Sequence, residues 1–273
     1  MDFPANPEFA DFRHAVDLLD SGDVEALRAH LAGHPQLIRQ HIAIDGSNYF
    51  KNPTLLEFVA ENPIRQGTLP ANIVEIAKVI LEAGAKGDQR VLNETLGLVS
   101  SGRIARERGA QVPLIDLLCD YGADPNYAMA PALPHGEFDA VNALLRRGAR
   151  ADLPVAAALG RYEDSQRLLA ASTTEERHRA LALASQFGHA PIVRLLLDAG
   201  EDPNRYNPAG FHGHSTPLHQ AALAGHDEVV QLLVERGARL DTQDTLWHGT
   251  PAGWAKYEGR TEIEEYLRAR EAR

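Results

Sequence analysis

Apolar side chains recur along the chain at a spacing that predicts helices ending in glycine. Before Gly237, for example, Leu233 stands four residues earlier and Val230 stands seven residues earlier. Positions three and four residues apart share one face of a helix, so each such set forms an apolar stripe. Glycine can take the left-handed conformation that ends a helix. The same pattern precedes further glycines, namely Gly84, Gly122, Gly148 and Gly200.

A second helix is predicted before each of these helices, and its start is clearest at Thr216. The threonine can cap the first turn, and Pro217 already has the backbone angle of a first helical residue. The same Thr-Pro start recurs at Thr250. A Gly-His pair such as Gly225-His226, or a variant of it, joins the two helices of each pair. The pattern predicts an all-α chain of about eight stacked helix pairs with irregular hairpin loops.

The segment 216–241 reads as a nearly complete ankyrin repeat, and the chain resembles the ankyrin repeat family from Phe12 to Arg268. The run from Gly122 to Asn126 matches the one that leads into that family's hairpin loop. The resemblance implies a solenoid in which each helix pair buries its apolar face against its neighbours. It implies a structural role for His219. As function it implies a non-enzymatic protein–protein interaction module with no cofactor, no metal and no catalytic residue.

The resemblance implies one ankyrin repeat domain over residues 1–273. Residues 1–42 form a degenerate N-terminal capping unit, residues 43–248 hold the repeats, and residues 249–273 form a C-terminal capping unit. Inserts interrupt the repeats near 61–70, 100–110 and 204–215. These inserts break the repeat pattern, so they are better functional candidates than the repeat residues themselves.

The repeats differ in length, and this predicts an irregular row of hairpins. The repeats between Gly122 and Gly200 are too short to hold two helices and a full hairpin. We therefore expect the row of hairpins to be interrupted in the middle of the chain. The inserts near 61–70 and 100–110 both stand between paired helices and should emerge on the same side.

Composition narrows the range of partners. The net charge of −11 excludes a generally basic surface of the kind that binds nucleic acid, and it favours a protein partner with a basic patch. No apolar run is long enough to span a membrane, and the first four residues do not begin a signal peptide. Only four of the 27 basic residues are lysines, which is typical of bacterial proteins with GC-rich genes. We expect a bacterial, cytoplasmic, monomeric protein.

Aromatic residues in the predicted hairpin segments are the main candidates for partner contacts. A large aromatic side chain on a loop is a typical interface anchor. Trp254, in the Thr-Pro helix start of the last repeat, also belongs to this group. The alternative is that each ring packs on a neighbouring hairpin or within the cap. The leading candidates are Tyr206, Phe211, His212, Trp247, His248 and Trp254, followed by Tyr49, Phe50 and Tyr127.

A second hypothesis is a small-molecule or metal-binding module centred on His212 and His214, because His-x-His in a loop can bind a metal ion. No carboxylate or cysteine lies in that loop to complete the ligand set. An enzyme is the least favoured class, since no pairing of a nucleophile with a base is visible. Arg103, Arg106 and Arg108 form a basic island that is either a solvated insert or a contact for an acidic partner.

Overall fold

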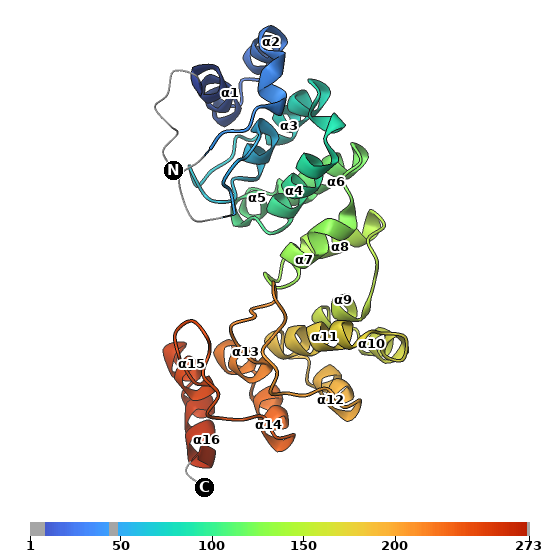
Figure 1. Ribbon diagram of the computed structural model, residues 1–273, viewed down its shortest axis with the longest axis vertical. Helices are drawn as coiled ribbons and strands as arrows, with labels where there is room; N and C mark the ends of the chain where they lie inside the picture. The colour runs from blue at the N-terminus through green and yellow to red at the C-terminus, as the bar shows by residue number, and fades with distance from the viewer. Residues whose placement is uncertain (1–8, 44–48, 272–273) are drawn as a thin grey trace. The chain divides into compact units, whose positions relative to one another are not determined.

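The described part of the computed structural model, residues 9–43 and 49–271, consists of helices joined by turns and loops and contains no strand (Figure 1). This confirms the predicted all-α class. The first eight residues of the predicted N-terminal capping unit lie outside the described residues, and they include the four residues that we expect not to begin a signal peptide. No helix in the described part is both long and apolar enough to cross a membrane.

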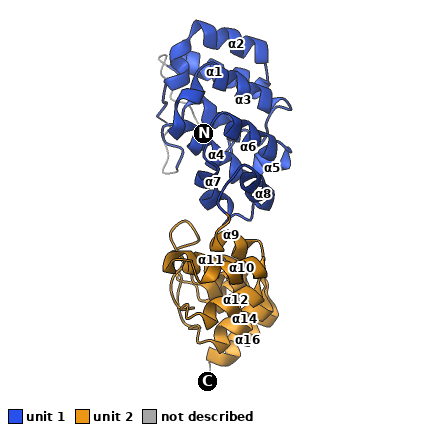
Figure 2. Ribbon diagram, turned by 90° about the vertical axis from the view of Figure 1, so that its right-hand side faces the viewer, with its two compact units in different colours: residues 1–150 blue, residues 151–273 orange. Residues whose placement is uncertain are grey.

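The chain divides into two compact units, residues 1–150 and residues 151–273 (Figure 2). We call them the N-terminal unit and the C-terminal unit and describe each by itself. The prediction of a single domain over residues 1–273 therefore stays a prediction.

The N-terminal unit contains four consecutive helix pairs within its described residues. In three of them both members are α-helices, and in the second pair the first member is the 3₁₀ helix η3. The pairs are α1 (Ala10–Ser21) with α2 (Val24–Gly33), η3 (Leu55–Ala60) with α3 (Ile73–Glu82), α4 (Gln89–Ser100) with α6 (Gln111–Asp120), and α7 (Pro125–Ala132) with α8 (Phe138–Arg146). The short helices η2 (Pro35–Arg39), η4 (Ala85–Gly87) and α5 (Arg103–Glu107) lie in the connections.

The C-terminal unit also contains four helix pairs, which completes the predicted number of about eight. They are α9 (Leu153–Ala158) with α10 (Tyr162–Leu169), α11 (Thr174–Gln186) with α12 (Ala190–Asp198), α13 (Pro217–Ala224) with α14 (Asp227–Glu235), and α15 (Pro251–Tyr257) with α16 (Thr261–Glu271). The first helices of neighbouring pairs pack together in the order α9, α11, α13 and α15. Alanines such as Ala184, Ala221 and Ala252 fill this row and let the backbones approach closely.

In the C-terminal unit, polar side chains tie each of the last three repeats to the one before it. In α13, Thr216 and His219 form a reciprocal capping box, and Gly225 ends the helix with a φ of 85°. The imidazole Nε2 of His226 lies 3.0 Å from the carbonyl oxygen of Gln186 in the preceding repeat. His189 makes the equivalent contact of 3.1 Å with Ala158. The last repeat uses an arginine instead, because Arg260 donates to Leu223 across 3.2 Å.

The inserts near 61–70 and 100–110 lie side by side. Asn62 donates to the carbonyl oxygen of Leu98 at 2.9 Å and to the hydroxyl of Ser101 at 3.2 Å. The first insert folds around the carboxylate of the buried Glu61, which accepts from the backbone amide of Arg65 at 2.7 Å. The second insert contains helix α5. These contacts agree with the expectation that the two inserts emerge on one side.

The helix bounds confirm the predicted interruption of the hairpins. Helix α7 begins at Pro125, directly after Gly122, and α9 begins at Leu153, soon after Gly148. A long connection also lies between Arg39 and Leu55, and two long loops precede the later pairs, before Pro217 and before Pro251. These two loops carry most of the predicted contact residues.

Candidate functional site

A buried aspartate organises the loop that precedes α15. The carboxylate of Asp244 accepts from the backbone amides of Leu246, Trp247 and Gly249 at 2.9, 2.6 and 2.7 Å. It also accepts from the indole nitrogen of Trp254 at 3.0 Å. Burial by itself would raise the pKa of Asp244, but these hydrogen bonds lower it to about 2. The loop is therefore fixed by a charged group that stays ionised over the whole physiological range.

This loop holds an aromatic cluster formed by His214, Trp247 and Trp254. The side chain of Trp247 is 68% exposed, while Trp254 is buried. The ring centroids of the two indoles are 6.1 Å apart, and the imidazole of His214 meets the indole of Trp247 edge-on at 5.2 Å. On its inner side Trp254 contacts His219 at 5.1 Å. One indole is thus anchored in the repeat core and holds its neighbour toward solvent.

A cavity of about 680 Å³ opens beside the cluster, between α13, α15 and the loops before them. Among its lining residues Glu258 has the only carboxylate, and none is a lysine or an arginine. Gly253 contributes open space because it has no side chain. We call this cavity the C-terminal aromatic pocket. Its lining residues are His212, His214, Gln220, Leu223, Trp247, Gly249, Gly253, Trp254, Tyr257 and Glu258.

Three of the predicted contact residues, His212, Trp247 and Trp254, meet at this pocket. Tyr206 is 40% exposed and donates from its hydroxyl to the carbonyl oxygen of Gln243 at 2.6 Å, which joins the two long loops. His248 is exposed beside the pocket without lining it.

The expectation that Phe211 is exposed at a loop tip is wrong. Its ring is only 5% exposed and lies against the guanidinium of Arg179. The loop folds back on itself, because the amide of Phe211 donates to Pro208 at 2.9 Å and that of Ser215 donates to His212 at 3.0 Å. Phe211 therefore supports the loop from beneath.

Sequence reasoning missed Tyr257 and Glu258 as pocket residues. Tyr257 is 85% exposed and follows Trp254 by three residues, and Glu258 follows it by four. Residues at these spacings share a helix face. The signal was therefore present once Trp254 was singled out.

The remaining three candidates gather in the N-terminal unit around a cavity of about 800 Å³. Tyr49 and Tyr127 are exposed there, at 68% and 49%. Phe50 lines the cavity too, but it is buried and packs against Phe58 at 5.3 Å, contrary to the expected loop-tip position. Tyr127 lies in helix α7 and not in a hairpin, because the short repeat has no room for one. We call this cavity the N-terminal mixed pocket.

The N-terminal mixed pocket carries charges of both signs. Arg90 and Glu94 form an ion pair of 2.9 Å in its wall. The buried carboxylate of Glu57 lines it as well and accepts from the amide of Thr54 at 2.6 Å. Burial raises the pKa of Glu57, although the hydrogen bonds from Thr54 oppose this. The pocket has no dominant charge or apolar character.

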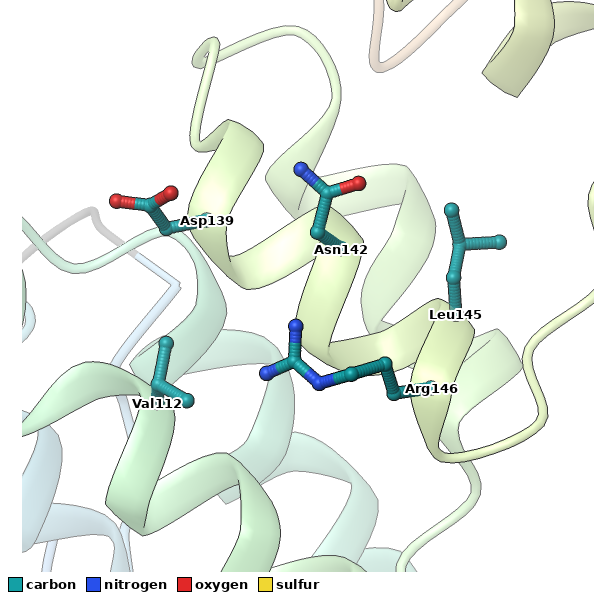
Figure 3. Close-up of a pocket in the computed structure, with 5 residues that line it drawn as sticks. All are labelled: Val112, Asp139, Asn142, Leu145 and Arg146. Carbon is teal, nitrogen blue, oxygen red and sulfur yellow. The ribbon is translucent and has the colours of Figure 1, made fainter.

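A further hollow lies on the surface formed by α6 and α8 (Figure 3). Four side chains project from successive turns of α8 beside Val112 of α6, namely those of Asp139, Asn142, Leu145 and Arg146. Only Val112 and Leu145 offer apolar surface, and the hollow lacks an aromatic anchor. It is therefore less suited to hold a partner than the C-terminal aromatic pocket.

The metal-binding hypothesis gains no support. Within the described ranges, no group of three or more histidine, cysteine, aspartate or glutamate side chains could hold a metal ion. The rings of His212 and His214 are 6.1 Å apart and meet edge-on. The basic island is largely neutralised, because Arg103 pairs with Glu107 at 3.4 Å and Arg106 pairs with Glu137.

Comparison with known proteins identifies the family of the chain. A family model described as ankyrin repeats (3 copies) matches residues 103–244 and 183–272. Over 110 residues the chain is 38% identical to ankyrin repeat and SAM domain-containing protein 6 of Mus musculus, which covers 40% of this chain and 12% of that protein. Over 126 residues it is 35% identical to cyclin-dependent kinase 4 inhibitor B of Bos taurus. This match covers 45% of this chain and 93% of that protein. Over 210 residues it is 30% identical to ankyrin repeat and KH domain-containing protein mask-1 of Caenorhabditis elegans. This match covers 71% of this chain and 8% of that protein.

These relatives are animal proteins, and the chain spans only a small part of two of them. The names of two of them include the ankyrin repeat. Since the family model matches more than half of its residues, the chain belongs to the ankyrin repeat family and is a protein–protein interaction module.

Proposed function

We propose that the C-terminal unit binds its protein partner through the aromatic pocket and the two loops beside it. The observation that carries this proposal is the exposed indole of Trp247, held in place by the hydrogen bonds that its loop donates to Asp244. An interface anchor that is already fixed loses little conformational entropy on binding. Tryptophan in such a position is enriched among the residues that dominate binding free energy.

The surrounding residues extend this surface. His212 and Trp254 line the same pocket, and Tyr206 and His248 are exposed on the neighbouring loops. Phe211 contributes indirectly, because it supports the loop that carries His212. The net charge of −11 favours a partner with a basic patch, and added salt should then slow association.

A second contact surface is proposed at the N-terminal mixed pocket. The exposed rings of Tyr49 and Tyr127 line one cavity although they are far apart in sequence. Tyrosines on a pocket rim supply large contact area at low entropic cost. This surface could bind a different segment of the same partner or a different partner.

We propose further that the protein has no catalytic activity of its own and acts by binding alone. The ankyrin repeat family and a relative that is named as an inhibitor of cyclin-dependent kinase 4 support this. A bacterial source, a cytoplasmic location and a monomeric state stay predictions from composition.

The test compares partner capture by the wild-type chain with capture by two single variants of one loop. Trp247→Ala removes the anchor, and Leu246→Ala removes an apolar side chain that is 59% exposed but does not line the pocket. Affinity capture from the source cell, followed by mass spectrometry, should retain the same partners with wild type and Leu246→Ala and lose them with Trp247→Ala. Equal capture by all three would refute the assignment.

Both substitutions are on the surface, so the free energy of unfolding of each variant, measured in urea, should differ from that of wild type by no more than about 0.5 kcal/mol. This control separates lost binding from lost structure. A double variant that combines Trp247→Ala with Phe211→Ala is unsuitable for this test, since Phe211 is buried and its loss would disturb the loop.

A further inference from the structure

The C-terminal aromatic pocket has a chemical character that narrows its occupant. Its walls are aromatic rings and aliphatic groups, its only ionisable carboxylate is Glu258, and neither lysine nor arginine lines it. We propose that this pocket receives an arginine side chain of the partner protein. The inference rests on the proposed function and adds to it the residue type that is recognised.

The rings stand at steep angles around the cavity. The imidazole of His214 is nearly perpendicular to the indole of Trp247, at 88°, and the two indoles are inclined by 59°. Tyr257 adds an exposed ring on the side of α15. A cation over the face of a tryptophan is attracted by the ring's negative face. Surfaces in several orientations allow a flat guanidinium to stack on one ring while others exclude water.

The charge around the pocket favours a cation. Glu258 can accept two parallel hydrogen bonds from a guanidinium, the strongest geometry for such a pair. The guanidinium of Arg260, the residue before α16, is already engaged, because it donates to the carbonyl oxygen of Leu223 at 3.2 Å. The chain as a whole carries −11, which attracts basic segments over longer distances.

Arginine fits this pocket better than lysine does. An ammonium group is compact and strongly hydrated, so it needs several acceptors to replace its water. A guanidinium is more weakly hydrated and stacks on aromatic faces. With many rings and a single carboxylate, the pocket offers the surroundings that suit the guanidinium.

Gly253 provides a way to close the pocket without disturbing the repeat. A Cβ atom built on it would meet only the hydroxyl of Thr250, at an ordinary contact distance of 3.6 Å. Its backbone is helical within α15 and needs no left-handed angle. A leucine at this position should therefore fold normally and fill space that the guanidinium would occupy.

The chain reports binding without a label, because its two tryptophans both line this pocket. The probes are three peptides that differ at one position, acetyl-Gly-Ser-Xaa-Ser-Gly-amide with Xaa as arginine, lysine or citrulline. Citrulline has nearly the shape of arginine without the charge. Tryptophan fluorescence is titrated at low salt with the full chain and its variants.

The arginine peptide should saturate the signal at a concentration about tenfold lower than the citrulline peptide does, with lysine between them. Glu258→Gln should weaken arginine binding about fivefold, Gly253→Leu should abolish it, and Leu246→Ala should leave it unchanged. Equal binding of arginine and citrulline, stronger binding of lysine, or no binding of any peptide would overturn the inference.

The two proposals fail in different ways. If Trp247→Ala loses the cellular partner while the peptides do not bind, the proposed partner surface is supported and the arginine assignment is wrong. If the arginine peptide binds but Trp247→Ala still captures every partner, the pocket recognises arginine and the proposed interface is wrong.

Discussion

One helix in each unit, η3 and α13, starts with the same kind of capping box but with a different acceptor. In the N-terminal unit the amide and hydroxyl of Thr54 donate to the carboxylate of Glu57, at 2.6 and 3.0 Å. In the C-terminal unit the amide and hydroxyl of Thr216 lie 3.3 and 2.8 Å from Nδ1 of His219. One cap uses an acidic acceptor and the other a neutral imidazole. The position three residues after the capping threonine can therefore hold either a carboxylate or an imidazole as acceptor.

Burial acts on the two groups in opposite directions. It raises the pKa of Glu57 and lowers the pKa of His219, since in each case it disfavours the charged form. His219 has a second bond, 3.1 Å from Nε2 to the carbonyl oxygen of Gly249. Its Nδ1 accepts and its Nε2 donates, which defines one neutral tautomer. The C-terminal cap thus links two repeats, whereas the carboxylate of Glu57 accepts within its own cap.

The largest expected effect is at His219. Replacing it with alanine removes the cap of α13, the bond to Gly249 and the ring contact with Trp254, so it should destabilise the C-terminal unit by about 2–4 kcal/mol. Urea unfolding followed by tryptophan fluorescence measures this directly, because both tryptophans lie in that unit. A loss below about 1 kcal/mol would show that the imidazole is not a structural link.

The next effect is acid sensitivity of the C-terminal unit. Burial lowers the folded-state pKa of His178 and His219 below 6.5, so the unfolded chain takes up protons first as the pH falls. The unfolding free energy should therefore decrease as the pH drops through about 6.5, and again from about 4 toward 2 as Asp244 becomes protonated.

Fluorescence-detected urea midpoints at pH 7.5, 6.5 and 5.5 test this direction. In a His219→Gln variant the decrease between these pH values should be smaller, with His178 accounting for what remains. A midpoint that stays constant or rises toward pH 5.5 in the wild-type chain would contradict the assignment.

The smallest expected effect is at Glu57, where stability changes with pH in the opposite direction. Its raised pKa means that the folded N-terminal unit keeps a proton that the unfolded chain has lost, so its contribution to stability declines as the pH rises above 4.5. Glu57→Gln keeps an acceptor for Thr54 without the charge and should change stability at pH 7 by less than about 1 kcal/mol. Hydrogen exchange of the backbone amides in η3 measures it, and a large loss of protection would show that the charge itself is needed.

The sequence predicted the repeats because their signals are local. Apolar spacing, the Thr-Pro starts and the terminal glycines each act within one helix pair, so the number of pairs and the interrupted hairpins followed directly. The division into two compact units did not, because it depends on how tightly successive repeats pack.

The candidate site was only partly predictable, for a different physical reason. Exposure was inferred from position on a loop, yet Phe211 turns inward because its loop closes on itself by backbone hydrogen bonds. The local sequence carries no signal for the role of Asp244, and only the folded loop shows that its carboxylate accepts from three amides and an indole. Tyr257 was within reach of sequence reasoning through its helical spacing from Trp254.

The contacts of His189, His226 and Arg260 with the preceding repeat bear on how such a chain can lengthen. Each residue occupies the turn of its own repeat and uses a carbonyl of the one before it. A duplicated repeat placed between α12 and α13 would therefore bring its own linking side chain and offer a new carbonyl to its successor. Growth by duplication needs no compensating change elsewhere, and the change from histidine to arginine at the last turn shows that the linking residue can be replaced while the contact persists.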